Sequence, residues 1–369
     1  MAKRKSNRTD TASEAPAGNA ATPSAAQLTR AIKNLDRDLA EMLQRRAGLS
    51  VERAKLGKPV ADSAVPEDAL TVPGPMQQSG LEPIFREIAA ACRELVAPQR
   101  VAYLGPDFTF SHLAAYHRFG RSSELVPVGS IAAVFEEVES GNCSFGIVPL
   151  ENSTDGRISD TLDCFSRSPA RICGELPLRV HHCLLGSGER RDIRRVYSKP
   201  QALSQCRKWL AGHLPQAEVI ANASTAEAAR LARDDRQVAA IASRQAGVEH
   251  ELNILAENIE DNPDNVTRFA VIGPSPASPS GNDKTALMFE VVHEPGALAD
   301  AMNLFKRNRL NMTWIESFPI PGSGGRYLFF VEFVGHQTEL RARRAIAALG
   351  KKSLRLEVLG SYAQCEAID

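Results

Sequence analysis

The sequence has no excess of charge of either sign, since its 369 residues include 44 Lys and Arg and 44 Asp and Glu. A chain with equal numbers of positive and negative residues has no net positive charge to attract nucleic acid or an anionic membrane surface. It also contains no apolar run near the roughly 20 residues that a membrane span needs, and the basic start MAKRKSNRTD is not followed by the apolar region of a secretory signal. We therefore expect a cytoplasmic protein that binds neither nucleic acid nor a membrane.

Disulfide and metal-binding patterns are missing as well. The seven cysteines are odd in number and include no C-x-x-C spacing, and the eight histidines include no H-E-x-x-H. Unpaired thiols in a reducing compartment are the simplest interpretation of such cysteines. The adjacent His181 and His182 lie within an apolar, strand-like stretch, which favours a structural role over a metal site. The sequence thus predicts no bound metal.

What the chain does contain is enough apolar sequence, 43% of its residues, to build the cores of two or three domains. Residues 1–25 are rich in Ala, Ser, Thr and Pro, and we expect a disordered tail there. Residues 26–98 are predicted to be helical. The first helix has an apolar stripe at helical spacing, formed by Leu28, Ile32, Leu35, Leu39 and Met42. The stripe continues to Arg46, which either extends to solvent or meets an anion.

From residue 100 to 274, short apolar strands alternate with helices, the pattern of parallel α/β layers. The stretch 170–186 is long enough to cross between two such lobes, whose cleft opens where strands end. A Pro- and Ser-rich linker, 275–283, follows. Residues 284–362 show the order β-α-β-β-α-β, which predicts a ferredoxin-like α+β unit. The expected architecture is therefore multidomain: helices, two α/β lobes and a small α+β domain.

Polar side chains stand where three of the predicted strands end. The first group follows GIVPL, the second begins at the end of RRVYS and continues into a helix, and the third is a threonine before FAVIG. The residues of these groups are Glu151, Asn152, Ser153 and Thr154, then Ser198, Gln201 and Gln205, then Thr267. Each group alone could be explained by helix caps or turns. Three groups in one two-lobed domain favour a binding cleft lined by hydroxyls and amides.

Four long motifs in the α/β region resemble those of prephenate dehydratase, and they come in the same order. They are YLGPDFTFSHLAA, GIVPLENSTDGRISDTLD, SKPQALSQC and DNPDNVTRF. The C-terminal unit resembles the ACT regulatory domain through GALADAM and NMTWIESFP, and the N-terminal helices resemble chorismate mutase, mainly through IFREIAAACREL. The resemblance implies a fusion of these three parts, with a dehydratase domain built like the two lobes of periplasmic binding proteins.

The implied reaction converts prephenate to phenylpyruvate, CO2 and water, on the route to L-phenylalanine. Because aromatisation of the ring drives it, no cofactor is expected. Thr267 is the implied catalytic group, which would donate a hydrogen bond or a proton to the leaving hydroxyl, and Glu151 is a rival acid because burial raises a carboxyl pKa. Asn152, Ser198 and Gln205 are implied to bind and orient the substrate. Further substrate contacts are implied for Thr109, Ser111, Ser153, Gln201, Arg268 and Phe269.

Some positions depart from the family patterns. Phe108 replaces a glycine of the first dehydratase motif, and Lys199 replaces a histidine of the third. In the mutase part, Arg46 and Asp62 match active-site residues, but several other charged positions are replaced, and chorismate mutase depends on charged groups that clamp its transition state. We expect weak or absent mutase activity, with the helices kept for dimerisation. A fully bifunctional enzyme is the alternative.

The ACT unit is implied to bind L-phenylalanine as a feedback inhibitor. The implied effector-binding residues, in two segments, are Gly296, Ala297, Leu298, Asn311, Glu316 and Ser317. The first segment opens a helix, whose N–H groups suit a carboxylate. Phe318 stands where the family has arginine, so we expect weaker or altered inhibition, in a homodimer or homotetramer. Two other functions stay open: arogenate dehydratase, and a non-enzymatic two-lobed sensor of an amino acid or organic acid.

Overall fold

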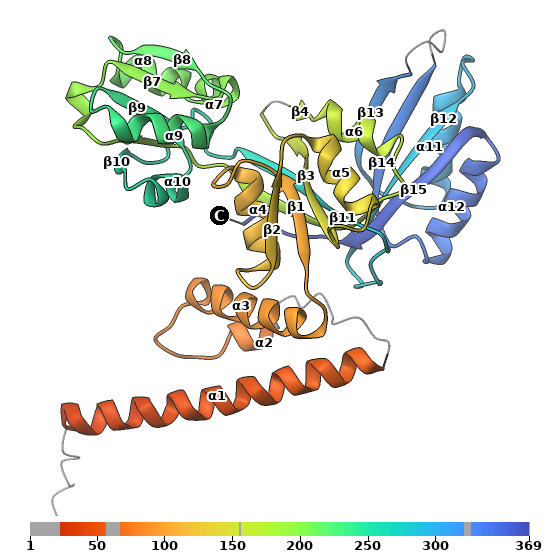
Figure 1. The fold of residues 1–369 in the computed structure, drawn as a ribbon. Helices are drawn as coiled ribbons and strands as arrows, with labels where there is room; N and C mark the ends of the chain where they lie inside the picture. The colour runs from red at the N-terminus through yellow and green to blue at the C-terminus, as the bar shows by residue number, and fades with distance from the viewer. Residues whose placement is uncertain (1–22, 57–66, 155, 321–325, 369) are drawn as a thin grey trace, which may run out of the picture. The chain divides into compact units, whose positions relative to one another are not determined.

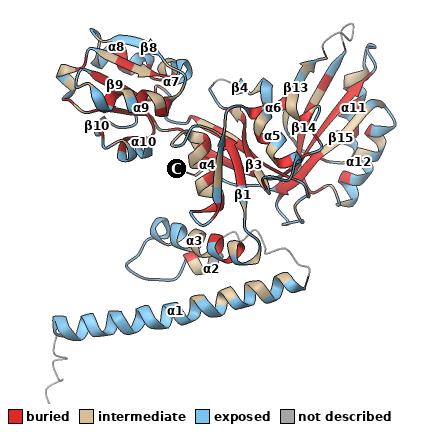
Figure 2. Ribbon diagram, viewed as in Figure 1, coloured by how far each residue is buried: buried red, intermediate tan, exposed pale blue. Residues whose placement is uncertain are grey.

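The computed structural model describes residues 23–56, 67–154, 156–320 and 326–368. The chain divides into two compact units, 1–58 and 59–369. In the first unit, the described residues form one long helix, α1 (Ala25–Lys55), which begins with a capping box between Ser24 and Gln27. Its predicted apolar stripe is exposed along its whole length, and Figure 2 shows the helix coloured mostly as exposed. The described residues of this unit therefore leave the stripe uncovered.

Two further N-terminal helices belong to the second unit. They are α2 (Glu67–Leu70) and α3 (Gln78–Val96). Helix α3 packs on α4 (Phe110–Phe119) so closely that a Cβ added at Gly120, whose φ is +77°, would lie 2.5 Å from the Cβ of Ala90. The sequence predicted one helical unit over 26–98, whereas the structure groups α3 with the α/β region that follows.

The first lobe is a mixed sheet in the order β2-β1-β3-β11-β5, with β4 paired to β3 (Figure 1). Its strands are β1 (Arg100–Leu104), β2 (Glu124–Val128), β3 (Phe145–Asn152), β4 (Gly156–Arg157), β5 (Arg171–Arg179) and β11 (Val266–Gly273). Only β1 runs parallel to its neighbours β2 and β3, whereas β11 is antiparallel to both β3 and β5. The prediction of parallel layers was therefore wrong for β11 and β5. One face packs on α4, and the other on α5 (Ile131–Glu139) and α6 (Ser159–Phe165).

The second lobe is a sheet in the order β10-β6-β9-β7-β8. Its strands are β6 (Cys183–Gly186), β7 (Arg195–Ser198), β8 (Glu218–Ala221), β9 (Val238–Ala242) and β10 (Asn253–Ala256). Its helices are α7 (Pro200–Gln205), α8 (Arg207–His213), α9 (Thr225–Asp234) and α10 (Arg244–Glu249). The predicted helix from Pro200 to His213 is divided at Cys206. The chain crosses into this lobe between β5 and β6, within the predicted stretch 170–186, and returns between β10 and β11.

The C-terminal part has the predicted order β-α-β-β-α-β. Its elements are β12 (Asp283–Val291), α11 (Ala297–Arg307), β13 (Met312–Pro319), β14 (Tyr327–Val334), α12 (Leu340–Gly350) and β15 (Ser353–Ala363). The sheet order is β13-β14-β12-β15, and every neighbouring pair is antiparallel. The expected linker ends one residue early, because the buried Asp283 already starts β12 and accepts hydrogen bonds from the backbone of Ser280 and Gly281.

The C-terminal sheet packs directly on the first lobe. One hydrophobic core contains Ile172 and Ala270 from the first lobe together with Met288 and Phe330 from the C-terminal sheet. A Cβ added at Gly360 of β15 would lie 2.0 Å from the carbonyl oxygen of Ile172, so the two backbones touch there. The linker therefore does not separate two independent cores.

The seven cysteines all lie in described segments, and each is a free thiol. Within the described segments, no helix combines the length and apolar character needed to cross a membrane.

Candidate active site

Thr267 lies at the start of β11, opposite Asn152, the last residue of β3. The Nδ2 atom of Asn152 donates a hydrogen bond of 2.8 Å to Oγ1 of Thr267, and both side chains are at least nine-tenths buried. Because the threonine oxygen accepts this bond, its own proton can be donated to a third group. In a buried setting such a chain of hydrogen bonds polarises the hydroxyl. The structure thus brings together two of the predicted site residues.

A third buried amide, Asn265, completes this cluster, and the sequence analysis did not name it as a site residue. Its Oδ1 accepts hydrogen bonds from Asn152 Nδ2 at 3.0 Å and from Thr154 Oγ1 at 3.2 Å. Its Nδ2 atom is buried and has no hydrogen-bond partner among the described residues. A buried donor in this state suits a ligand oxygen. The motif DNPDNVTRF already contained the signal, since the family pattern keeps this asparagine beside the threonine.

Ser153 links the strand ends rather than a substrate. Its Oγ accepts a hydrogen bond from the backbone N–H of Val266 at 2.9 Å and donates one to the carbonyl of Asp264 at 3.3 Å. These bonds hold the turn after β3 against the start of β11, which fixes the positions of Asn152 and Thr267. The predicted substrate contact of Ser153 is thus replaced by a structural role.

Glu151 and Arg268 lie on the opposite face of the sheet from Thr267. They are direct cross-strand partners one residue along from the pair of Asn152 and Thr267, and successive side chains of a strand alternate between faces. Arg268 donates from Nη1 to Glu151 Oε2 at 3.1 Å. The predictions of Glu151 as a rival acid and of Arg268 as a substrate contact are therefore corrected, because both face away from the threonine hydroxyl.

Three other predicted contacts also have structural partners. Phe269 is only 2% exposed and packs in the core beneath α4. Thr109 caps α4, accepting from the N–H of His112 at 3.4 Å and donating to the carbonyl of Pro106 at 2.9 Å. Ser111 is buried in the first turn of the same helix. Thr109 is therefore a helix cap, and Phe269 is a core residue.

The second lobe brings Gln205 together with His182. The Nε2 atom of His182 lies 2.9 Å from Oε1 of Gln205, and since this oxygen can only accept, Nε2 carries the proton. Burial lowers the pKa of His182, so the ring is neutral, and its Nδ1 atom has no partner within the described segments. Glu260 orients the same segment by accepting from His181 Nδ1 at 2.7 Å and from the N–H of His182 at 2.9 Å. The structural role expected for these histidines is thus observed.

Ser198 and Gln201 differ in their surroundings. Ser198 is fully buried at the end of β7, and its Oγ donates to the carbonyl of Ile241 at 2.6 Å. Gln201 is exposed, although it stands four residues before the buried Gln205. Lys199 is the N-cap residue of α7, so the serine does not cap that helix.

A loop of the first lobe reaches the second lobe at Phe108. Its φ of +64° is in the left-handed region, which costs a residue other than glycine roughly 1–2 kcal/mol. Its side chain packs against the core of the second lobe and contacts the rings of His112 and His250 edge-on. Its carbonyl accepts from Ser243 Oγ at 3.1 Å. The strain falls where the resembling motif has glycine, and the side chain's contacts between the lobes offset it.

Known proteins resemble this chain over most of its length. The sequence model described as prephenate dehydratase matches residues 101–277. A bifunctional chorismate mutase/prephenate dehydratase of Stutzerimonas stutzeri is 39% identical over 90% of this chain and 95% of its own length. The chain belongs to the prephenate dehydratase family.

Solved structures of similar proteins agree with this membership. A prephenate dehydratase from Arthrobacter aurescens in complex with L-Phe is 33% identical, with a TM-score of 0.68 over 72% of this chain and 90% of the other. A protein described as GqqA, a novel type of quorum quenching acylase, is 30% identical, with a TM-score of 0.66 over 72% of this chain and 98% of the other. One fold thus carries two described activities, so the reaction must be argued from the site.

Beyond the range of the family's sequence model, the C-terminal sheet has a small pocket of about 100 Å³ at the start of α11. It is lined by Val291, Val292, His293, Glu294, Ala297, Leu298, Arg326, Tyr327 and Phe329. Gly296 is the N-cap residue of α11. Glu316 and Ser317 lie elsewhere, on the edge strand β13, where both accept hydrogen bonds from Arg157 Nη1, at 2.9 and 2.8 Å. Ala297 and Leu298 thus line this pocket, whereas Glu316 and Ser317 do not.

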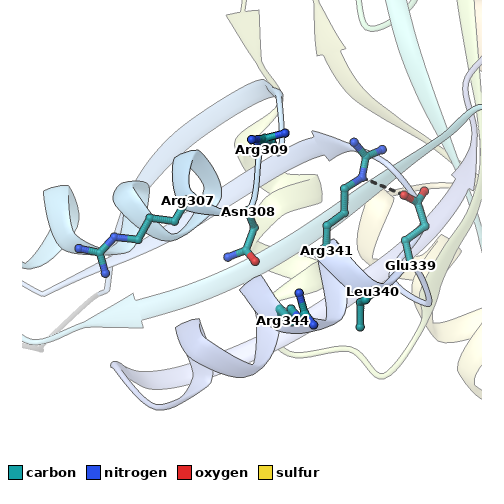
Figure 3. A pocket seen from close by; sticks show the side chains of 7 residues that line it. All are labelled: Arg307, Asn308, Arg309, Glu339, Leu340, Arg341 and Arg344. Atoms are coloured by element: carbon teal, nitrogen blue, oxygen red, sulfur yellow. Dashed lines mark hydrogen bonds and ion pairs between the residues drawn. The ribbon is translucent and has the colours of Figure 1, made fainter.

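A larger hollow of about 560 Å³ lies between the end of α11 and the start of α12 (Figure 3). It is lined by Arg307, Asn308, Arg309, Glu339, Leu340, Arg341 and Arg344. Arg341 Nε donates to Glu339 at 2.9 Å, and Figure 3 shows Arg307 extending away from Arg341. The arginines thus do not converge on one point. Across the described segments, no group of three or more His, Cys, Asp or Glu could hold a metal ion.

Proposed function

We propose that this chain is a carbon–oxygen lyase that converts prephenate to phenylpyruvate, CO2 and water in the synthesis of L-phenylalanine. Family membership supports the choice of reaction. The observation that supports Thr267 as its catalytic group is that the buried hydroxyl accepts a 2.8 Å hydrogen bond from Asn152. This arrangement leaves the hydroxyl proton to be donated to a substrate oxygen. The free thiols at all seven cysteines suit an enzyme of the cytoplasm.

The reaction requires a group that donates a proton to the leaving hydroxyl. The bond between the ring and its carboxylate breaks to give CO2, and its electron pair enters the ring as the hydroxyl departs. The leaving oxygen gains a proton and becomes water, and the aromatic product supplies the driving force. Threonine is a weak acid, so its effect must come from its fixed position in a water-poor site. The bonds from Asn152 and the turn of Ser153 supply that fixed position.

The second lobe supplies the groups that would orient the substrate. Gln205 is held by His182, and Ser198 lies at the end of β7 in the same lobe. Lys199 adds a cation beside them, which suits a substrate with two carboxylates. In this assignment Thr267 is catalytic, and Asn152, Asn265 and Gln205 bind the substrate.

The C-terminal unit is proposed to be an ACT domain that binds L-phenylalanine and inhibits the enzyme. The pocket at Ala297 and Leu298 supports this proposal, because the first turn of α11 offers N–H groups to a carboxylate and the apolar part of the lining suits a benzyl side chain. Asn311, Glu316 and Ser317 would complete the site from a second copy, which agrees with a homodimer or homotetramer. With Phe318 in place of arginine, we expect the inhibition to be weaker or altered.

Residues 26–98 are proposed to be a degenerate chorismate mutase segment retained for dimerisation. Arg46 lies on α1 in the structure, whereas Asp62 falls outside the described residues. Robust turnover of chorismate by the full chain would contradict this proposal and favour the fully bifunctional enzyme.

The function is tested by following phenylpyruvate formation from prephenate in ultraviolet light, L-phenylalanine formation from arogenate, and the loss of chorismate. Prephenate is expected to be consumed fastest. Thr267→Ala should lower kcat by about 10²- to 10⁴-fold, the usual contribution of a positioned proton donor, while Thr267→Ser, which keeps the hydroxyl, should retain most of the activity. Faster turnover of arogenate would show that arogenate, not prephenate, is the substrate. Binding of these acids without turnover would indicate a sensor. A fully active Thr267→Ala variant would show that Thr267 is not the proton donor.

A further inference from the structure

The face of the first sheet opposite Thr267 carries a buried ion network centred on Arg268. Its Nη2 atom lies 3.0 Å from Glu175 Oε2 and 2.6 Å from Glu332 Oε2, and its Nη1 atom pairs with Glu151. The carboxylates of Glu175 and Glu332 are 2% and 1% exposed, so solvent screens them little. Glu175 comes from β5 of the first lobe, whereas Glu332 comes from β14 of the C-terminal sheet.

Glu332 is the residue through which the C-terminal sheet holds this arginine. Tyr362 donates to its Oε2 at 2.7 Å and Thr313 to its Oε1 at 2.7 Å, while Lys284 Nζ lies 3.5 Å away. Burial alone would raise the pKa of Glu332, but Arg268, Lys284 and the two hydroxyl donors hold it below its usual value. The carboxylate is therefore charged, and it is fixed by groups on β12, β13 and β15.

The backbone next to Thr267 needs such an anchor. The β3–β11 ladder shifts register between Arg268 and Phe269, a bulge that redirects neighbouring side chains. On the other side, Arg268 stands opposite Pro177 of β5, which has no N–H to donate to a ladder. The backbone hydrogen bonding of β11 to its two neighbouring strands is thus weak at this point. The side chain of Arg268 connects the bulge to the buried carboxylates of Glu175 and Glu332.

We propose that Glu332 of the C-terminal unit is a positioning residue for the dehydratase reaction. By holding Arg268, it sets the backbone of β11 at the bulge, and through it the direction of the Thr267 hydroxyl. This inference rests on the proposed function, in which Thr267 is the proton donor. It also gives the C-terminal sheet a part in basal turnover, in addition to any effector binding.

The test is steady-state prephenate turnover by the full chain carrying Glu332→Gln or, more mildly, Tyr362→Phe. We expect Glu332→Gln to lower kcat by about 10- to 100-fold, the effect of a misplaced catalytic group, with KM changed less than about twofold. Tyr362→Phe, which removes one hydrogen bond to the same carboxylate, should lower kcat less. Glu290→Gln is the matched control, because Glu290 is a buried acid of the same sheet that pairs with Arg326 instead. Its kcat should equal that of the wild type.

A double-mutant cycle separates positioning from general loss of structure. If Glu332 acts through Thr267, Glu332→Gln should lower kcat in the wild-type background but cause no further loss in a Thr267→Ala background. An equal fold-loss in both backgrounds, or a folded Glu332→Gln with wild-type kcat, would overturn the inference. Should Glu332→Gln not fold, an unchanged kcat in Tyr362→Phe would overturn it. A fully active Thr267→Ala, by contrast, would contradict the proposed function itself.

Discussion

At the scale of single residues, the active-site face and its support are separated by one position in the chain. Thr267 points toward Asn152 on one face of β11, and Arg268 points toward Glu151 on the other. The motif that contains them therefore encodes two different tasks. In the proposed function Thr267 meets the substrate, and in the inference above its neighbour Arg268 holds the strand in place.

Phe108 shows a second local compromise, between backbone strain and packing. Its φ of +64° favours glycine, but its ring fills a place at the core of the second lobe. Phe108→Gly and Phe108→Ala both remove the ring, and only alanine keeps the strain. We expect the alanine variant to have a free energy of unfolding about 1 kcal/mol lower than the glycine variant, measured by urea denaturation. Equal stabilities would show that the loop relaxes out of the left-handed region when the ring is gone.

At the scale of elements, the docking of α3 on α4 contains a titratable contact. Arg86 Nη1 of α3 lies 3.1 Å from Nδ1 of His117 in α4. Burial, and then the nearby Arg86, lower the pKa of His117 to about 4. The folded state thus keeps this ring neutral, whereas the unfolded chain protonates it below its ordinary pKa near 6.5. Protonation therefore favours unfolding as the pH falls from about 6.5 toward 4.

The expected size of this effect can be measured. Between pH 7 and pH 5, His117 should lower the free energy of unfolding by up to about 2 kcal/mol. His117→Gln should remove that part of the pH dependence, while His112 and His182, whose pKa values burial also lowers, keep the remainder. His213→Gln, at an exposed ring stacked on Trp209, is the control. An unchanged slope in His117→Gln urea titrations would contradict the assignment.

At the scale of the whole molecule, α1 carries an apolar stripe that its own unit does not cover among the described residues. An isolated helix gains little stability in water without a packed face, and the stripe residues Leu28, Ile32, Leu35 and Leu39 are all about half or more exposed. We therefore expect a second copy of the chain to cover the stripe. This expectation agrees with the dimer or tetramer of the proposed function.

Substitutions on α1 test this prediction. Leu35→Glu with Leu39→Glu should shift the assembly toward the monomer in light scattering coupled to gel filtration, since each buried leucine contributes about 1.5–3 kcal/mol. Arg37→Glu, on the opposite side of the same helix, should leave the molar mass unchanged. A wild-type molar mass of about 40 kDa would show that the stripe has no partner copy.

The sequence predicted the elements well where a local pattern decides them. The order β-α-β-β-α-β followed from the apolar runs, and the placing of Thr267 and Asn152 in one site followed from the motifs. The site roles predicted for Arg268 and Glu151 were wrong because they rested on motif membership alone. Consecutive residues of a strand point to opposite faces, so neither side chain shares the face of Thr267 and Asn152. The partnership of Arg268 with Glu332 could not be predicted, because the two are 64 positions apart and meet only through the packing of two sheets.

The contact of Gly360 with Ile172 bears on how regulation could be lost in evolution or in strain engineering. A gene with a stop codon after residue 273 would encode a chain that keeps both lobes but exposes to water a hydrophobic face formed in part by Ile172 and Ala270. We expect such a product to aggregate, so that the loss of feedback inhibition would not yield an active enzyme. Mutants selected for overproduction should therefore carry missense changes rather than truncations.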